Sequence, residues 1–164
     1  MQTHAPHRFQ FVEHLGYVSL FPLLLRILPP DASELLDIID MLHDPQRLWS
    51  PYGIRSLSAA DAMWYGRANA PGDEPYWRGA VWININYLVL AGLHHYAHRL
   101  GPGRARAAQV YTELREIVVG NMLREWLRTG YFWEQYDPET GHGRRTHPFN
   151  GWSSLVLLIL AEKY

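Results

Sequence analysis

The spacing of apolar residues constrains the fold most, because it follows a helical repeat along nearly the whole chain. No strand-like alternation of apolar and polar residues runs longer than four residues. Segments that are apolar nearly all round alternate with amphipathic ones, and long loops separate some of them. This pattern predicts an all-α domain with two layers of helices, buried inside and half exposed outside. A plain four-helix bundle would need shorter loops.

Helix boundaries are marked by proline, glycine and capping residues. Asp31, with Glu34 three residues later, predicts a capping box at the start of the second helix. The expected helices are 17–28, a segment from Asp31 to before Asp44, 80–100, 104–128 and 152–162. Loops are expected at 45–79 and 131–151. Residues 1–15 are interpreted as a tail or connection, and residues 16–164 as one domain, as the length of 164 residues suggests.

Charge and composition exclude several classes of partner. The net charge of −1 supplies no basic face for nucleic acid. The chain has no cysteine, which excludes disulfides, thiol catalysis and Cys-ligated zinc. The longest apolar run, 155–161, is far shorter than the roughly 20 residues of a membrane span. We therefore expect neither nucleic acid nor a membrane as a partner of this segment.

Aromatic residues are abundant, with 7 Trp, 10 Tyr and 5 Phe. Six large rings fall in the loop 45–79, which is long for a segment without regular structure: Trp49, Tyr52, Trp64, Tyr65, Tyr76 and Trp77. Such rings stack on the apolar faces of sugars and also fill cores. The composition suggests a carbohydrate ligand without deciding between these two uses.

Sequence motifs give little support for nucleophilic catalysis or for metal binding. His94 and His98 share one helix face, but the pair lacks the Glu of a zincin motif and an obvious third ligand. A polar edge near a helix C-terminus explains them equally well. No serine lies in a nucleophile elbow of the G-x-S-x-G type. We predict no metal.

Glu134 stands apart from the other carboxylates because aromatic residues flank it just after a helix end. The acidic residues assigned to solvated helix faces are Asp37, Asp40, Glu113, Glu116 and Glu125. Glu134 either performs catalysis or holds its loop through Arg144 or Arg145. Inverting glycoside hydrolysis requires a carboxylate base and a carboxylic acid roughly 6.5–9.5 Å apart. Glu134 fits the base, and Asp61 and Asp73 are the plausible acids within the chain.

The sequence resembles the C-terminal part of the catalytic domain of glycoside hydrolase family 63, in particular its N-glycan-processing α-glucosidases. The matching stretches are 16–22 (GYVSLFP), 48–57 (LWSPYGIRSL), 75–88 (PYWRGAVWININYL), 94–96 (HHY), 129–136 (TGYFWEQY) and 149–155 (FNGWSSL). Together they extend over nearly the whole chain, and the stretch 75–88 is the most specific.

The resemblance implies the C-terminal portion, about half, of an (α/α)6 toroid. It implies an inverting exo-glucosidase that needs no cofactor and removes the terminal α-1,2-linked glucose from the glucosylated N-glycan precursor in the endoplasmic reticulum lumen. It assigns Glu134 as the general base. The substrate-binding residues it suggests are Trp77, Arg78, Trp82, Tyr52, Arg55, Trp133, Phe149 and Trp152.

The chain departs from the family in size. The resemblance places the general acid, an Asp, upstream of Met1, so we expect a fragment that is inactive alone and needs the upstream half of the toroid as its partner. Two alternatives stay open. One is a related (α/α)6 glycosidase of other specificity, such as a trehalase-like enzyme or a bacterial α-glucosidase. The other is a non-catalytic half-toroid that binds carbohydrate or serves as a scaffold.

Overall fold

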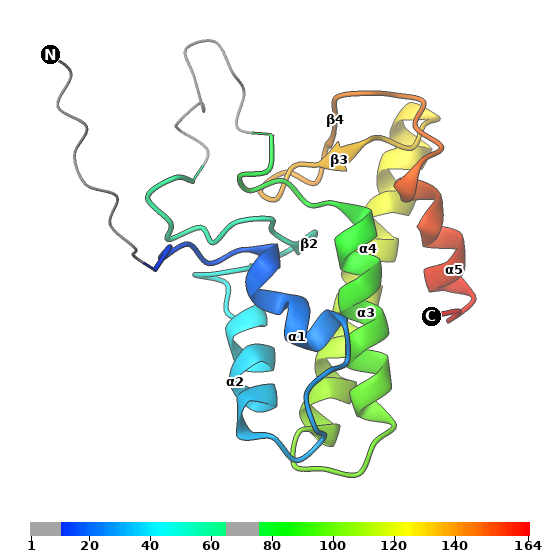
Figure 1. Ribbon diagram of the computed structural model, residues 1–164. Helices are drawn as coiled ribbons and strands as arrows, with labels where there is room; N and C mark the ends of the chain where they lie inside the picture. Colours follow the sequence, from blue (N-terminus) through cyan, green and yellow to red (C-terminus); the bar gives the residue numbers. More distant parts are fainter. Residues whose placement is uncertain (1–10, 65–75) are drawn as a thin grey trace, which may run out of the picture.

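The structure is a computed structural model that describes residues 11–64 and 76–164. Helices dominate it, and the strands are only two residues long each (Figure 1). In chain order the elements are η1 (Tyr17–Leu20), α1 (Phe21–Leu24), α2 (Ser33–Leu42), β1 (Trp49–Ser50), β2 (Gly53–Ile54), α3 (Ile83–Ala97), α4 (Arg104–Thr129), β3 (Gln135–Tyr136), β4 (Gly143–Arg144), η2 (Trp152–Leu155) and α5 (Val156–Leu160). The helix-rich fold agrees with the predicted class.

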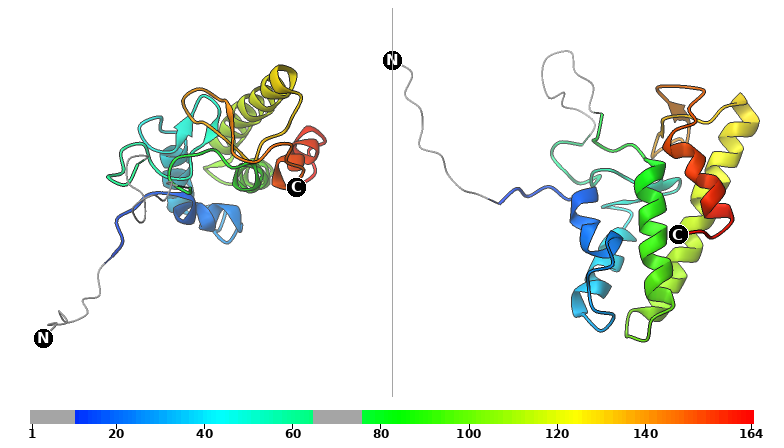
Figure 2. Two further views of the ribbon diagram at one scale, coloured as in Figure 1. Left: turned by 90° about the horizontal axis from the view of Figure 1, so that it is seen from above. Right: turned by 45° about the vertical axis from the view of Figure 1, so that its right-hand side comes forward.

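Two antiparallel helices, α3 and α4, lie side by side at the centre (Figures 1 and 2). Helices α1 and α2 pack on one side of this pair, and α5 packs on the other. The apolar stripe predicted for α4 lies against the core, since all its members are buried: Ala107, Val110, Tyr111, Leu114, Val118 and Met122. Side chains from every helix join this single core.

The ends of α4 match the prediction closely because strong local signals mark them. Gly101, Pro102 and Gly103 precede Arg104, the first residue of the helix. At the other end Gly130 adopts a left-handed φ of 78°, a conformation that glycine adopts without strain. Its N–H donates to the carbonyl of Trp126 at 2.7 Å and closes the helix.

Several helix starts and ends differ from the prediction, among them the end of α3 at Ala97 rather than residue 100 and the end of α5 at Leu160 rather than residue 162. The segment 17–28 forms η1 and α1 and ends at Leu24, because Arg26 turns the chain with a φ of 57°. The cap of α2 is Ala32 rather than Asp31, and the predicted capping box with Glu34 does not form. Helix α3 begins at Ile83 rather than residue 80. Its preceding backbone is extended because Val81 pairs with Arg55 and Tyr136.

Short backbone pairings, which the helical periodicity did not predict, organise the two long loops. Strand β1 pairs with β2 and β3 with β4, each as an antiparallel hairpin. Three isolated bridges then connect distant segments: Gly16 with Leu57, Arg55 with Val81, and Val81 with Tyr136. The start of α3, the end of α4 and the hairpin β3–β4 consequently lie at one end of the molecule (Figure 1).

Apolar side chains are exposed on two faces. One includes Val18, Leu25 and Ile27 around α1, and the other includes Leu123, Leu127 and Leu157 on α4 and α5. Within the described residues, no helix combines the length and apolar character that crossing a bilayer requires.

Candidate functional site

Glu134 lies immediately before β3 and is 7% exposed. Its backbone N–H donates to the carbonyl of Thr146 at 3.0 Å, and the Thr146 N–H donates to Glu134 Oε2 at 3.3 Å. The indole Nε1 of Trp152 donates to the Glu134 carbonyl at 2.7 Å. Three hydrogen bonds therefore fix this residue between the hairpin β3–β4 and η2.

The two arginines considered as structural partners of Glu134 have contacts of their own. Arg144 forms an ion pair with Asp137. Arg145 lies over the ring of Tyr76, 4.4 Å from its centroid. These contacts connect the hairpin loop to the aromatic residues that precede α3.

A group of stacked rings lies next to Glu134 and contains four of the residues proposed from the sequence. Trp77 stacks on Trp82 with ring centroids 3.9 Å apart and an interplanar angle of 15°. Trp82 contacts Trp152 at 5.6 Å, and Trp152 contacts Phe149 at 4.7 Å. Trp77 is 48% exposed, whereas Trp82 has no exposed surface. Trp82 can thus support a ligand-binding ring, and Trp77 can present a face to a sugar.

A buried polar network fixes the position of Trp82. The backbone N–H of Trp82 donates to the hydroxyl of Tyr17 at 3.1 Å, and the side-chain amide of Asn86 donates to the Trp82 carbonyl at 2.8 Å. Asn86 also exchanges hydrogen bonds with the backbone of Ile54. Burial raises the pKa of Tyr17, so its hydroxyl stays neutral. Sequence reasoning missed Asn86, although an amide one turn after Trp82 in an apolar helix was the available signal.

Trp133 sits over the hairpin that carries Glu134. Its ring lies against His147 at a tilt of 34° with centroids 3.8 Å apart, and its Nε1 donates to Thr129 Oγ1 at 3.1 Å. A Cβ at Gly143 would come within 2.0 Å of the Trp133 ring, so only glycine fits there. Arg78 follows Trp77 in the chain and is half-buried.

The side chains of Tyr52 and Arg55 contact other groups than the rings beside Glu134, although the Arg55 backbone pairs with Val81 next to Trp82. The Arg55 Nη1 donates to the Pro45 carbonyl at 2.8 Å, and burial lowers the pKa of this guanidinium. Tyr52 lies beneath Arg124, whose guanidinium carbon is 5.9 Å from the ring centroid. In the part of the chain that the structure describes, no side-chain hydrogen bond or ring contact connects either residue with the rings beside Glu134.

The prediction that Glu125 belongs to a solvated helix face is wrong, because this residue is only 2% exposed. It accepts two hydrogen bonds from Arg128, at 2.8 and 2.7 Å, and one from the Gly143 N–H at 2.8 Å. His142 Nδ1 lies 3.1 Å away. The bonds from Arg128 are the largest cause that lowers the pKa of Glu125 to about 2, although burial opposes them. Glu125 thereby fastens β4 to the end of α4.

Of the two acid candidates within the chain, the structure describes only Asp61. Asp61 accepts a hydrogen bond from the Met63 N–H at 2.7 Å and pairs with His14 at 3.0 Å. Burial raises the pKa of Asp61, but these bonds outweigh burial and lower it, whereas a carboxylic acid catalyst needs a raised pKa. Asp73 lies outside the described residues.

The histidines of α3 are near one another without forming a ligand set. The rings of His94 and His98 have centroids 4.3 Å apart. Among residues 11–64 and 76–164, no three His, Cys, Asp or Glu side chains are grouped so that they could hold a metal ion.

Comparisons of sequence find a matching family model and several similar proteins. The family model described as "Glycosyl hydrolase family 63 C-terminal domain" matches residues 1–162. The chain is 44% identical over 163 residues to Mannosyl-oligosaccharide glucosidase GCS1 of Arabidopsis thaliana, covering 99% of this chain and 19% of that protein. It is 48% identical over 152 residues to a probable mannosyl-oligosaccharide glucosidase of Schizosaccharomyces pombe, covering 92% of this chain and 18% of that protein. The chain thus spans about a fifth of these relatives.

A solved structure shares the fold. The family 63 mannosylglycerate hydrolase from Thermus thermophilus, crystallised with glucose, matches with a TM-score of 0.65 and 24% sequence identity. The match covers 91% of this chain and 32% of that one. The arrangement of helices described above therefore recurs in part of a larger helical enzyme.

Proposed function

Since the chain belongs to glycosyl hydrolase family 63 and corresponds to its C-terminal domain, we propose that it supplies the base-bearing part of an exo-α-glucosidase site. The reaction is removal of the terminal α-1,2-linked glucose from the glucosylated N-glycan precursor, with inversion at the sugar carbon. Sequence relatives named mannosyl-oligosaccharide glucosidase, aligned over nearly the whole chain, support this substrate class. We also propose a location in the lumen of the endoplasmic reticulum, since the glucosylated N-glycan precursor is found there.

The placement of Glu134 carries the proposal. Its backbone is fixed by Thr146 and by Trp152, whose indole N–H donates to the Glu134 carbonyl and whose ring belongs to the neighbouring group of aromatic rings. As general base, the carboxylate accepts a proton from the water that attacks the sugar carbon on the face opposite the leaving oxygen. Trp77, half exposed above Trp82, provides a flat surface for the glucose ring.

The general acid belongs to the other half of the site in this proposal. An inverting enzyme protonates the leaving oxygen from a second carboxyl group, which contributes roughly 10²–10⁴-fold to the rate. The lowered pKa of Asp61 makes it unsuitable for this role. The upstream half of the toroid is the partner that supplies the acid.

The test measures glucose release from a glucosylated N-glycan bearing the terminal α-1,2-linked glucose. We expect no release by the chain alone and release after the upstream half of a family 63 toroid is added. In that reconstituted enzyme, Glu134→Gln should lower turnover by about 10²–10⁴-fold, the usual contribution of a positioned base. Glu116→Gln, an exposed glutamate on α4, is the control and should leave turnover unchanged.

Each alternative predicts a different result. Release by the chain alone at an enzyme-like rate would overturn the split site. Near-normal turnover by Glu134→Gln would overturn the assignment of the base. Binding of the oligosaccharide without turnover in any combination would instead favour a non-catalytic carbohydrate-binding half-toroid.

A second candidate is a family 63 hydrolase of other specificity. A relative from Thermus thermophilus named mannosylglycerate hydrolase is 36% identical over 92 residues, which cover 55% of this chain. The longer alignments with the mannosyl-oligosaccharide glucosidases favour the first candidate. A comparison of hydrolysis rates for mannosylglycerate and for the glucosylated N-glycan distinguishes the two.

A further inference from the structure

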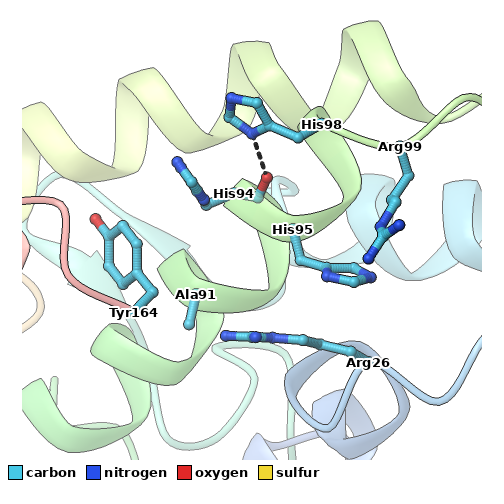
Figure 3. A pocket seen from close by; sticks show the side chains of 7 residues that line it. All are labelled: Arg26, Ala91, His94, His95, His98, Arg99 and Tyr164. Atoms are coloured by element: carbon cyan, nitrogen blue, oxygen red, sulfur yellow. Dashed lines mark hydrogen bonds between the residues drawn. The ribbon is translucent and has the colours of Figure 1, made fainter.

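A cavity of about 240 Å³ lies at the C-terminal end of α3, and Figure 3 shows the side chains that line it. The fifteen residues of α3 separate it from the start of the helix by roughly 20 Å, at about 1.5 Å per residue. Its polar lining comes from three segments: Arg26 after α1, Tyr164 after α5, and the end of α3 with His94, His95, His98 and Arg99. Nothing in the proposed glycosidase site uses these residues.

Two arginine side chains converge on this cavity without a partner of their own. Within the part of the chain that the structure describes, neither Arg26 nor Arg99 forms a side-chain hydrogen bond or an ion pair. Arg26 also has a left-handed φ of 57°, which is uncommon outside glycine, asparagine and aspartate. That turn directs the chain after α1 so that Arg26 faces His95 across the cavity (Figure 3).

The two arginines act on the histidines that line the cavity. Burial is the main cause that lowers the pKa of His94, and His98 and Arg26 act in the same direction. Burial, Arg99 and Arg26 likewise lower the pKa of His95. Both imidazoles are therefore neutral at neutral pH, and a negative charge in the cavity would favour their protonation.

One carboxylate, Glu162, faces His94 and is already engaged elsewhere. It accepts a hydrogen bond from the Tyr111 hydroxyl at 2.6 Å and lies 3.8 Å from Arg115. The Tyr111 hydroxyl also lies 3.1 Å from that of Tyr164. Glu162 opposes the lowering of the His94 pKa without reversing it. The charge that the two arginines bring to the cavity is thus not balanced by the carboxylate beside it.

We propose that this cavity binds a tetrahedral dianion, either sulfate or a phosphate group. Guanidinium groups donate parallel hydrogen bonds to such oxyanions, and imidazoles supply further donors once they are protonated. Two guanidiniums from separate segments and three imidazoles on one helix end give this donor set. The site is independent of the glycosidase proposal, because it involves none of the residues around Glu134.

The proposal predicts that binding strengthens as the pH falls. His94 and His95 gain protons on acidification, and each proton adds attraction for the anion. Sulfate is the suitable probe because its charge is constant over this range. We expect the Kd for sulfate to be about tenfold lower near pH 6 than near pH 8 at constant ionic strength, which corresponds to one additional charged hydrogen bond.

Calorimetric titration of the whole chain with sulfate measures this directly. Arg26→Asn, which tolerates the left-handed turn, and Arg99→Gln should each weaken binding about tenfold. Arg104→Gln is the control, since this neighbouring arginine donates to the Ala97 carbonyl and does not line the cavity. Circular dichroism checks that each variant is folded.

A second readout keeps the test decisive if a variant fails to fold. Sulfate should raise the pKa of His94 and His95 in histidine NMR titrations of the unmodified chain, and sodium chloride at equal ionic strength should not. Equal sulfate affinity at the two pH values, or unchanged histidine titrations, would overturn the proposal. Inorganic phosphate and a hexose phosphate, titrated in parallel, distinguish a free ion from a phosphate group on a larger molecule.

Discussion

Replacing Glu125 with glutamine tests how the hairpin that carries Glu134 is attached to α4. The wild-type carboxylate has a pKa of about 2, against an ordinary value of 4.5, because Arg128, Gly143 and His142 stabilise its charged form. One pKa unit is worth about 1.4 kcal/mol, so the difference corresponds to roughly 3 kcal/mol. Arg128 and His142 are more than half exposed, and solvent screening reduces the contribution to about 2 kcal/mol at neutral pH.

The sign of the pH dependence follows from the lowered pKa. The stabilisation is fully present above the unfolded value of about 4.5 and is lost as the pH falls toward about 2. Urea unfolding of the wild-type chain should therefore show falling stability over this acidic range. The Glu125→Gln variant should be about 2 kcal/mol less stable at pH 7, and the difference should shrink toward zero near pH 2.

Glu116→Gln on the exposed face of the same helix provides the matched control. Its unfolding free energy should stay within about 0.5 kcal/mol of wild type at both pH values, as is usual for surface substitutions. The reasoning would be refuted if Glu125→Gln unfolded with the wild-type free energy at pH 7. A constant difference between the two profiles down to pH 2 would refute the electrostatic explanation in particular.

Two further substitutions test the rings beside Glu134. Trp77→Ala should weaken binding of a glucosylated oligosaccharide about tenfold or more in a calorimetric titration, since it removes a half-exposed stacking surface. The circular dichroism spectrum should stay unchanged. Unfolding of the variant would instead favour a purely structural role for this ring. Asn86→Ala should cost about 1–3 kcal/mol in urea unfolding because it leaves the buried N–H of Ile54 without its acceptor. The half-buried Asn84→Ala should cost less than about 1 kcal/mol. Equal losses from the two would contradict the role given to the Asn86 network.

The sequence predicts those elements whose limits are set by neighbouring residues. Helix α4 begins after Gly103 and ends at Gly130, as the glycines and proline around it indicate. Helix α3 was predicted to start three residues early, because pairing of Val81 with Arg55 and Tyr136 depends on segments far away in the chain. Local propensity contains no information about such pairings.

The buried position of Glu125 could have been predicted from the pattern of apolar residues along α4. It follows Met122 by three residues and so continues the buried stripe of α4, yet its charge suggested a solvated position. A glutamate on an apolar stripe indicates a buried partner. The grouping of Trp77, Trp82 and Trp152 around Glu134 needed the assembled fold, because the residues come from different loops.

The three isolated bridges have a consequence for the order of folding. Each connects segments that are far apart in the sequence, such as Val81 and Tyr136, for the gain of only a few hydrogen bonds. Closing such loops costs entropy that is recovered only when α3 and α4 are already docked. The backbone around Glu134 is consequently expected to order late, after the helix pair has formed, so the proposed general base depends kinetically on a scaffold to which the proposal assigns no reacting group.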